Sequence, residues 1–412
     1  MRPSGVVTLT PLLFLGLLQG CGSDGVAPPD HITSLPRDLT LAEEMVIGRS
    51  NTFGFDLLKE VDQARPVSEP NVILSPLSAT MALGMALEGA DGETFSAMRD
   101  ALRFQGLSRE EINASYRGLL DLLLDLDPEV ELGIANSAWS RQGFPFVSSY
   151  FDAVTTSFDA EVQELDFDDP GAKGIINAWV SEKTNGRITE IIDGISPLDI
   201  LFLINAVYFQ GSWTTKFDKG DTYQGSFRLG SGETVTVPTM SAEKMAMRFG
   251  TVDGIQVGEL PYGGGAFAMT LAVPPPDQSV DDLVSQLDDD RWSELLDATS
   301  EGKFPVRLPK FELKWDGLLK GALSAMGMGP AFVPQADFSR MTPALDAYIS
   351  EVRQKTFMKV DEDGTVAAAV TSVTVGVTSI PLGLYVDRPF LLAIRERLSG
   401  AILFLGVIRD PR

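Results

Sequence analysis

The chain is poor in the residue types on which most catalytic and metal chemistry depends. His31 is its only histidine and Cys21 its only cysteine, and both precede the region in which globular patterning begins. A Ser-His-Asp or Cys-His nucleophile needs an imidazole to accept its proton, and zinc sites built from thiolates or imidazoles need several such ligands. Residues 41–412 can assemble neither of these, and they can form no disulfide. Carboxylate chemistry survives this argument, but no spacing singles out a pair of acids.

Positive charge is also scarce. The chain has 33 Lys and Arg against 57 Asp and Glu, which gives a formal net charge of −24. Such a charge repels phosphate backbones and anionic membrane surfaces, so we expect no nucleic-acid partner. We interpret the acidity as a property of a solvated surface and expect no cofactor and no metal.

The N-terminus has the features of an export signal. Arg2 precedes the apolar stretch 6–18, which is shorter than the roughly 20 residues that a membrane span needs. We therefore predict a signal peptide over residues 1–20. The sequence Leu18-Gln19-Gly20-Cys21 resembles the bacterial lipobox, although Gln19 departs from the small residue usual there.

Lipidation of Cys21 would make residues 21–40, with their three prolines, a tether, and residues 41–412 the folded domain. We expect an exported bacterial lipoprotein on the periplasmic or cell-surface face of a membrane. Its membrane contact would be through the lipid alone, with plain secretion as the alternative.

Apolar spacing predicts helices first and strands later. Helices are predicted over 45–61, over 78–87 with an end at Gly89, from the capping-box pair Ser108 and Glu111 through 122, and over 175–192 with a break at Asn185-Gly186. Strands are predicted over 200–209, where Asn205 interrupts an apolar run, and over 306–315, 348–360, 384–394 and 401–408. This order favours an α+β architecture.

The run 364–380 contains no charged residue and no proline, and it follows three acidic residues. Its Val and Thr content is typical of a strand, and Ala367, Ala368 and Ala369 are small enough to pass between packed strands. An exposed edge with this composition would be prone to aggregation. The run is therefore either a buried strand or a loop held outside a sheet that it can enter.

Ten segments in family order resemble the serpins over essentially all of residues 41–412. They are Asn71–Ser78, Gly89–Thr94, Ile176–Val180, Thr184–Gly186, Asn205–Trp213, Glu259–Tyr262, Leu308–Phe311, Ala336–Ser339, Asp387–Phe390 and Phe404–Gly406. The resemblance implies an α+β serpin fold, with helices around a large mixed main sheet, smaller sheets and an exposed reactive loop at about 364–381. It also implies a protease inhibitor rather than an enzyme.

The same resemblance assigns roles within the uncharged run. Gly364, Thr365, Val366 and Ala367–Ala369 correspond to the inhibitory hinge, and the reactive bond is placed between Thr378 and Ser379. A strand from Thr365 to Thr378 would span roughly 43 Å. The implied mechanism is suicidal: a protease cleaves this bond as an acyl-enzyme, and the freed loop inserts into the main sheet.

Thr378 offers a small β-branched side chain to the protease. It suits the shallow apolar pocket of an elastase-like or subtilisin-like serine protease and suits trypsin poorly, with cysteine proteases as a further partner class. Val375 and Val377 are alternative bait residues, so the bond is placed only to within a residue or two. We expect a monomer. The alternative is a non-inhibitory serpin used for binding or as a chaperone.

Two further sites follow from the resemblance. Trp213 matches the breach tryptophan at the top of the main sheet. Ser75, Ser78 and Asn205 match the shutter, where the sheet parts, but Gln354 stands in place of the family's histidine. Since glutamine both donates and accepts, we expect it to complete a network with these residues.

Overall fold

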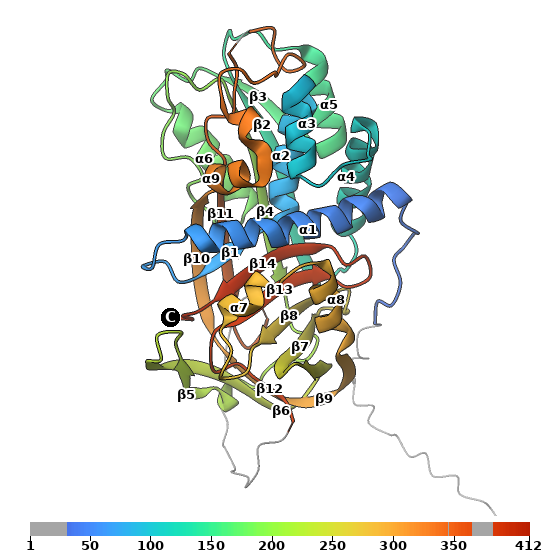
Figure 1. Ribbon diagram of the computed structural model, residues 1–412, viewed down its shortest axis with the longest axis vertical. Coiled ribbons are helices and arrows are strands. Elements are labelled where there is room, and N and C mark those ends of the chain that lie inside the picture. The colour runs from blue at the N-terminus through green and yellow to red at the C-terminus, as the bar shows by residue number, and fades with distance from the viewer. Residues whose placement is uncertain (1–30, 345, 365–381) are drawn as a thin grey trace, which may run out of the picture. The chain divides into compact units, whose positions relative to one another are not determined.

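The computed structural model describes residues 31–344, 346–364 and 382–412, and His31–Arg412 form one compact unit (Figure 1). Its helices are α1 (Leu41–Ala64), α2 (Pro76–Gly89), α3 (Gly92–Ala101), α4 (Arg109–Leu123), α5 (Ser148–Phe158), α6 (Ala172–Lys183), α7 (Val280–Ser285), α8 (Asp289–Asp297) and α9 (Lys320–Leu323). Short 3₁₀ and π turns are η1 (Lys219–Asp221), η2 (Ser324–Met328) and η3 (Gly329–Phe332). None of the helices in the described ranges is long and apolar enough to cross a membrane.

The strands form three sheets. They are β1 (Val72–Leu74), β2 (Val130–Arg141), β3 (Ala160–Leu165), β4 (Leu201–Gly211), β5 (Tyr223–Arg228), β6 (Thr234–Val252), β7 (Ile255–Tyr262), β8 (Phe267–Val273), β9 (Thr299–Pro309), β10 (Phe311–Leu318), β11 (Arg353–Val360), β12 (Leu384–Tyr385), β13 (Phe390–Glu396) and β14 (Ile402–Ile408). The nine-stranded sheet has the order β1-β14-β13-β8-β7-β6-β9-β12, with β5 paired to β6. The order β3-β2-β4 makes a three-stranded sheet, and β10-β11 makes a two-stranded one.

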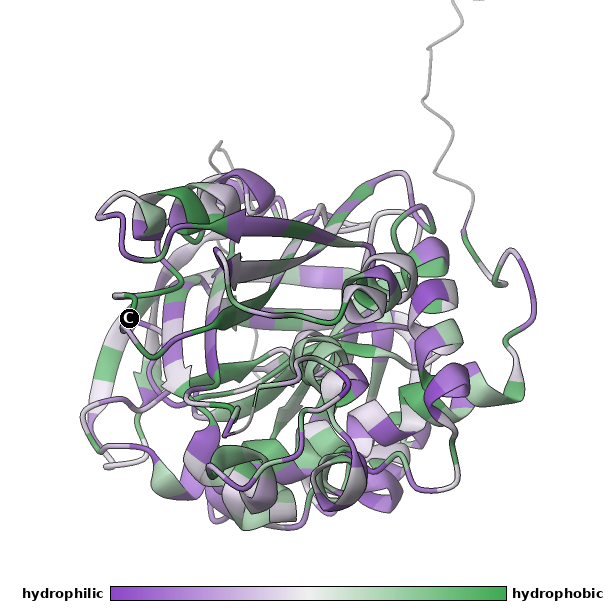
Figure 2. Cartoon of the chain, turned by 90° about the horizontal axis from the view of Figure 1, so that it is seen from above, coloured by the Kyte–Doolittle hydropathy of each residue, from purple (hydrophilic) through white to green (hydrophobic). Residues whose placement is uncertain are grey.

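The core lies between the helices and these sheets. In Figure 1, α2 to α5 lie on one side of α1, and most of the nine-stranded sheet lies on the other. Every residue of β8, β13 and β14 is buried, as expected for strands covered on both faces. Figure 2 shows hydrophobic stretches on strands in the middle of the molecule and hydrophilic residues on helix turns at its rim.

The predicted ends of helices are confirmed where neighbouring residues cap the helix. The capping box at α4 is present, because the Ser108 hydroxyl accepts from Glu111 N while the Glu111 carboxylate accepts from Ser108 N. A second capping box, Thr40 with Glu43, begins α1. Helix α2 ends at Gly89, as predicted.

The prediction of a helix over 175–192 is wrong in its second half. Helix α6 ends at Lys183, and Asn185 and Gly186 take left-handed φ values of 48° and 74°. The apolar spacing continued beyond this break because Ile188 and Ile191 are buried in an irregular segment. The buried residues of such an irregular segment can have the same spacing in sequence as the buried face of a helix.

Three strand boundaries also differ from the predictions. The run 306–315 is two strands in different sheets, β9 and β10, divided at Lys310, whose backbone N–H bonds to Pro238 O at 2.7 Å. The run 384–394 is divided into β12 and β13, with Pro389 between them unable to donate to a ladder. The strand predicted over 348–360 begins at Arg353, since the Ile349 N–H bonds instead to Ala331 O.

Residues 31–40, which the sequence analysis assigns to the tether, lie against the folded unit. Ile32 N donates to Gly264 O at 2.8 Å, and the side chains of Ile32, Leu35 and Leu39 pack against the core. These three apolar residues are too widely spaced to show a helical or strand period. The predicted signal peptide and Cys21 lie outside the described residues.

The sheet that carries Asn205 is divided rather than continuous. Strand β4 pairs with β2, and β11 pairs with β10. No backbone ladder joins β4 to β11 in the ranges that the structure describes. The single main sheet expected from the resemblance is thus separated into β3-β2-β4 and β10-β11.

Candidate functional site

The predicted hinge residues Thr365 to Ala369 and the reactive bond Thr378-Ser379 lie outside the described residues. The structure places the two ends between which they run. One end is Gly364, four residues after β11, and the other is Leu382, just before β12. The described part of the candidate site therefore consists of the residues that contact Gly364 and Leu382 and of the strands beside them.

Trp213 holds the backbone of the first end. It is buried, and its indole stacks on Tyr262 with ring centroids 4.5 Å apart and planes inclined by 11°. Its Nε1 donates to Asp361 O at 2.9 Å, and its backbone N donates to Asp363 O at 2.9 Å. Phe217 N donates to Glu362 O at 3.0 Å. The predicted breach tryptophan thus contacts the chain that leads into the hinge.

Each of the three acidic residues before Gly364 faces a lysine. The pairs are Lys359 with Asp361 (3.6 Å), Lys310 with Glu362 (2.7 Å) and Lys219 with Asp363 (2.5 Å). The sequence analysis missed these pairs because two of the lysines lie far from the acids in sequence. Lys310 itself lies in the segment Leu308–Phe311, one of the ten that resemble the serpins.

The Glu362 carboxyl is buried, as is that of Asp361. Burial by itself raises the pKa of Glu362, but hydrogen bonds from Lys310 and from Thr222 (2.7 Å) outweigh burial, so that the pKa lies below its ordinary value. Glu362 is therefore ionised at neutral pH. Its carboxylate links the chain just after β11 to Lys310, between β9 and β10, and to Thr222, directly after η1.

Gly364 occupies a position that other residues cannot adopt without strain. Its φ is 135°, and a Cβ added there would lie 2.1 Å from Gly211 O. It also bridges to Ser212, the residue directly after β4. The end of β4 and the end of β11 are thus joined at this point.

The second end is held by a very short strand. β12 has two residues, and it pairs in parallel with Val306 and Arg307 of β9. Tyr385 N donates to the side chain of Gln256 at 2.9 Å, and Val386 N donates to Arg307 O at 2.9 Å. The hydrogen bonds named here fix this side to β9 and to Gln256 of β7.

Among the hydrogen bonds that the structure describes, two of the four predicted shutter residues, Ser75 and Gln354, bond to each other, and Asn205 bonds to a residue outside the four. Gln354 contacts Ser75, accepting from its N–H at 2.9 Å and donating to its C=O at 2.9 Å. Asn205 donates instead to Asn136 Oδ1 at 2.6 Å, because the two asparagines are direct partners in the β2–β4 ladder. Ser78 is buried on α2. The expectation of a network joining Asn205 to Gln354 is therefore wrong.

Strands β4 and β11 present two edges that lack ladder partners among the described residues. They are linked at one end through Trp213 and Asp363. A small cavity of about 10 Å³ lies at one point between them, lined by Val207, Tyr208 and Phe209 of β4 and Phe357 of β11. An unpaired strand edge is a template for a further strand. Each of these edges therefore carries backbone N–H and C=O groups to which a further strand can hydrogen-bond.

The described residues contain no group of three or more His, Cys, Asp or Glu placed to hold a metal ion. The polar groups of the site are instead tied into backbone contacts and ion pairs that position the chain.

Known proteins agree with this geometry. The family model described as Serpin (serine protease inhibitor) matches residues 49–411. Iripin-8 of Ixodes ricinus is 34% identical over 398 residues, with 91% of this chain and 96% of Iripin-8 covered. The native structure of the thermophilic serpin tengpin matches with a TM-score of 0.79 and 28% identity, covering 93% of this chain and 97% of tengpin.

A thyroxine-binding globulin in complex with thyroxine has the same fold, with a TM-score of 0.78 and 26% identity over 88% of this chain and 98% of the globulin. The fold alone therefore does not decide between inhibition and ligand binding. The family match covers most of the chain, and its description is that of protease inhibitors rather than enzymes. This chain belongs to the serpin family.

Proposed function

We infer that the chain inhibits serine proteases as a suicide substrate. The observation that carries this inference is the pair of unpaired edges on β4 and β11, which are joined at the point where the uncharged run begins. A strand that enters there gains ladder hydrogen bonds on both of its edges and buries its alternate side chains. The fold would release this free energy only after the loop is cut, which is kinetic rather than equilibrium stability.

The chemistry belongs to the protease. Its serine Oγ attacks the carbonyl carbon of Thr378 and forms an ester, while the C–N bond to Ser379 breaks and the new amine of Ser379 takes up a proton. The segment Thr365–Thr378 then enters the sheet and carries the attached protease with it. No side chain of this serpin acts as acid, base or nucleophile.

The target class follows from Thr378. A small β-branched side chain fills a shallow apolar pocket, so the proposed targets are elastase-like or subtilisin-like serine proteases. Incubation with such a protease should give an SDS-stable complex, and sequencing of the released fragment should begin at Ser379. Cleavage into two fragments without a complex would contradict inhibition and would instead support a binding or chaperone role.

A pair of substitutions tests whether insertion is required. Alternate residues of a strand face opposite sides, so Ala369 would face the core of the sheet while Ala368 would face away. Ala369→Arg should convert the inhibitor into a substrate, raising the number of inhibitor molecules consumed per protease. Ala368→Arg is the matched control and should have the smaller effect. Equal effects would contradict insertion of this segment in this register.

The same proposal includes a location. Cys21 follows a short apolar stretch and a sequence that resembles a lipobox, and this favours a lipid-anchored, exported protein over a secreted one. The wild-type protein should incorporate labelled fatty acid and partition into detergent, and Cys21→Ser should do neither. Partition of the Cys21→Ser form into detergent would contradict the lipid anchor. Light scattering on that variant tests the expected monomer.

A further inference from the structure

Residues 184–200, here called the crossing segment, connect α6 to β4 and cover the space between β4 and β11. Thr184, Arg187 and Ile188 line the same small cavity as β4 and Phe357. Ile188 and Ile191 are buried in a cluster that includes Ile204 of β4, and Phe357 of β11 packs against this cluster. The crossing segment therefore touches both β4 and β11.

The crossing segment is fastened firmly on the side of α6 and β2. Asn177 of α6 accepts from Ile191 N at 2.8 Å and donates to Ile192 O at 3.0 Å. Arg141 of β2 donates to Asp199 O at 2.8 Å and to Ser196 O at 3.1 Å. On this side, hydrogen bonds to backbone atoms fix the segment at two separate points.

On the side of β11, the crossing segment is held by ion pairs, beside the packing of Phe357 and the Arg187 guanidinium 5.6 Å from the centre of the Phe357 ring. Asp193 forms a hydrogen bond with Arg353 of β11, and its carboxylate lies 3.4 Å from Lys355 Nζ. Both cations also lie beside Asp316 of β10, at 3.3 Å and 3.1 Å. Among the ion pairs that the structure describes, those of Asp193 alone connect the crossing segment to the two-stranded sheet.

The two sides of this contact differ in exposure. The side chains of Arg353 and Lys355 are 20% and 15% exposed, since their stems lie along β11, whereas that of Asp193 is 58% exposed. The cations are thus positioned by the strand, and Asp193, in the irregular crossing segment, is the more exposed partner. The hydrogen bond from Arg353 lowers the pKa of Asp193, so this carboxylate is charged at neutral pH.

We propose that Asp193, Arg353 and Lys355 form an ionic latch that holds the crossing segment over the space between β4 and β11 and slows the entry of a strand. Side chains of an entering strand project alternately to the two faces, so half of them would point toward the crossing segment. The segment must shift away from β11 to admit them. Because its other side is fixed by Asn177 and Arg141, Asp193 is where it can separate.

This proposal rests on the proposed function in one respect: the step that the latch slows is the entry of a strand. Exposed ion pairs contribute little free energy and are screened by salt. The latch should therefore set a rate within a modest range, and it should respond to ionic strength.

The test measures how fast a synthetic peptide with the sequence of residues 365–378 enters the full-length protein, followed on native gels. Asp193→Asn should accelerate entry about two- to five-fold at about 20 mM salt. The wild-type rate should rise to that of the variant at about 0.5 M salt, while the variant itself should respond little.

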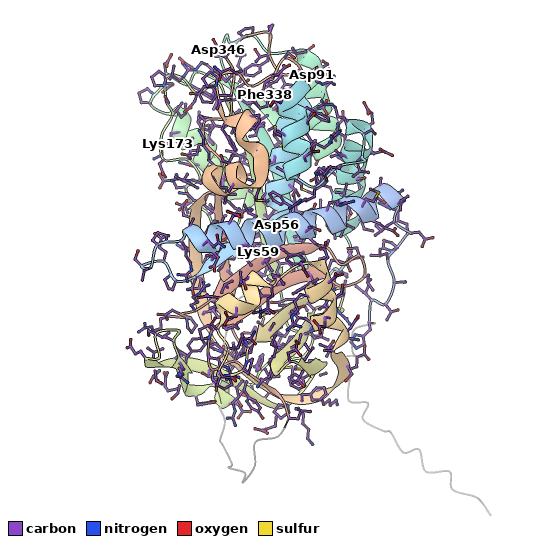
Figure 3. All side chains as sticks on the ribbon, viewed as in Figure 1. Asp56, Lys59, Asp91, Lys173, Phe338 and Asp346 are labelled. Atoms are coloured by element: carbon purple, nitrogen blue, oxygen red, sulfur yellow. The ribbon has the colours of Figure 1, made fainter. Side chains whose placement is uncertain are left out.

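The chain offers a matched control in the same segment. Glu190 pairs with Lys173 of α6 at 2.6 Å, so this ion pair does not reach β11 (Figure 3 labels Lys173 on α6). Glu190→Gln should leave both the rate and its salt dependence at wild-type values. If Glu190→Gln and Asp193→Asn behave alike, or if the Asp193→Asn rate retains the wild-type salt dependence, the latch is wrong.

A second variant guards against an effect of Asp193→Asn on folding. Lys355→Gln should also accelerate entry, and the double variant should be no faster than the faster single variant, because both changes break the same contact. Additive acceleration would overturn the latch. Peptide entry without a protease complex would overturn only the inhibitory function, whereas failure of every variant to take up the peptide would overturn both.

Discussion

Gln354 holds the backbone of Ser75 by two hydrogen bonds, with its amide oxygen accepting from Ser75 N–H and its amide nitrogen donating to Ser75 C=O, each at 2.9 Å. Both residues are buried. The contact joins β11 to the residue that precedes α2, and Ser75 Oγ continues it to Leu403 O on β14 at 2.6 Å. One neutral side chain thus ties the edge of the two-stranded sheet to the core.

Loss of this side chain should destabilise the native form. Gln354→Ala leaves the buried N–H of Ser75 without its acceptor, while Ser75 C=O keeps its bond from Ala79 N at 3.0 Å. An unsatisfied buried donor costs about 1–3 kcal/mol. The apparent urea midpoint should fall accordingly. Gln105→Ala is the control, because Gln105 is exposed and makes one backbone hydrogen bond; it should change stability by less than about 0.5 kcal/mol. Equal midpoints for the two variants would contradict the role assigned to Gln354.

Gln354 has no titratable group, so we predict that the rate of strand entry does not depend on pH. The chain has one histidine, His31, and it lies outside the region between β4 and β11. The rate of peptide entry should therefore be flat between about pH 5.5 and 7.5. Gln354→His should make the rate rise as the pH falls, because a protonated imidazole can no longer accept from Ser75 N–H. A wild-type rate that changes several-fold in this range would refute the prediction.

Gly364→Ala should loosen the junction between β4 and β11. The added Cβ would collide with Gly211 O, and the backbone at φ 135° disfavours any side chain. We expect a lower melting temperature for the native form. Gly321→Ala is the matched control: no atom lies within 4 Å of its added Cβ and the residue is in α9, so this change should be neutral or stabilising. A thermal melt of both variants decides.

The contribution of Glu362 to stability should disappear in acid. Its pKa is lowered in the folded chain from an ordinary value of 4.5, so its charge stabilises the fold fully above that value. The contribution is lost as the pH falls through the folded pKa. Glu362→Gln should therefore lower the urea midpoint at pH 7, and the difference from wild type should narrow below about pH 4.5. A constant difference at all pH values would show that packing, not charge, is responsible.

Local chemistry made parts of the fold predictable. The capping box at Ser108 and the glycine at the end of α2 depend on neighbouring residues only, so the sequence contains all of the information needed. The strand over 200–209 was predicted because its apolar run is uninterrupted except by Asn205. What such a run cannot indicate is the partner of each edge, since pairing depends on residues far away in the chain.

In the candidate site, too, residues within local motifs could be predicted, whereas partners that depend on which strands are adjacent could not. Trp213 and Gly364 could be identified because motifs around them resemble family segments. The partner of Asn205 could not, because whether an amide faces Asn136 or Gln354 depends on which strands are adjacent. Asp193 was not identified at all. It lies in an irregular segment where charge and spacing carry no signal until Arg353 and Lys355 are brought beside it.

The residues that follow the loop, from Leu382 onward, include two strands in the interior of the nine-stranded sheet. β13 lies between β14 and β8, and β14 lies between β1 and β13, with every residue of both strands buried. A cut between residues 364 and 382 would therefore give two polypeptides but still one particle, because the shorter piece is held by neighbours on both edges of its strands. Gel filtration or light scattering of the nicked protein would report an unchanged mass, and the two pieces would separate only in denaturant.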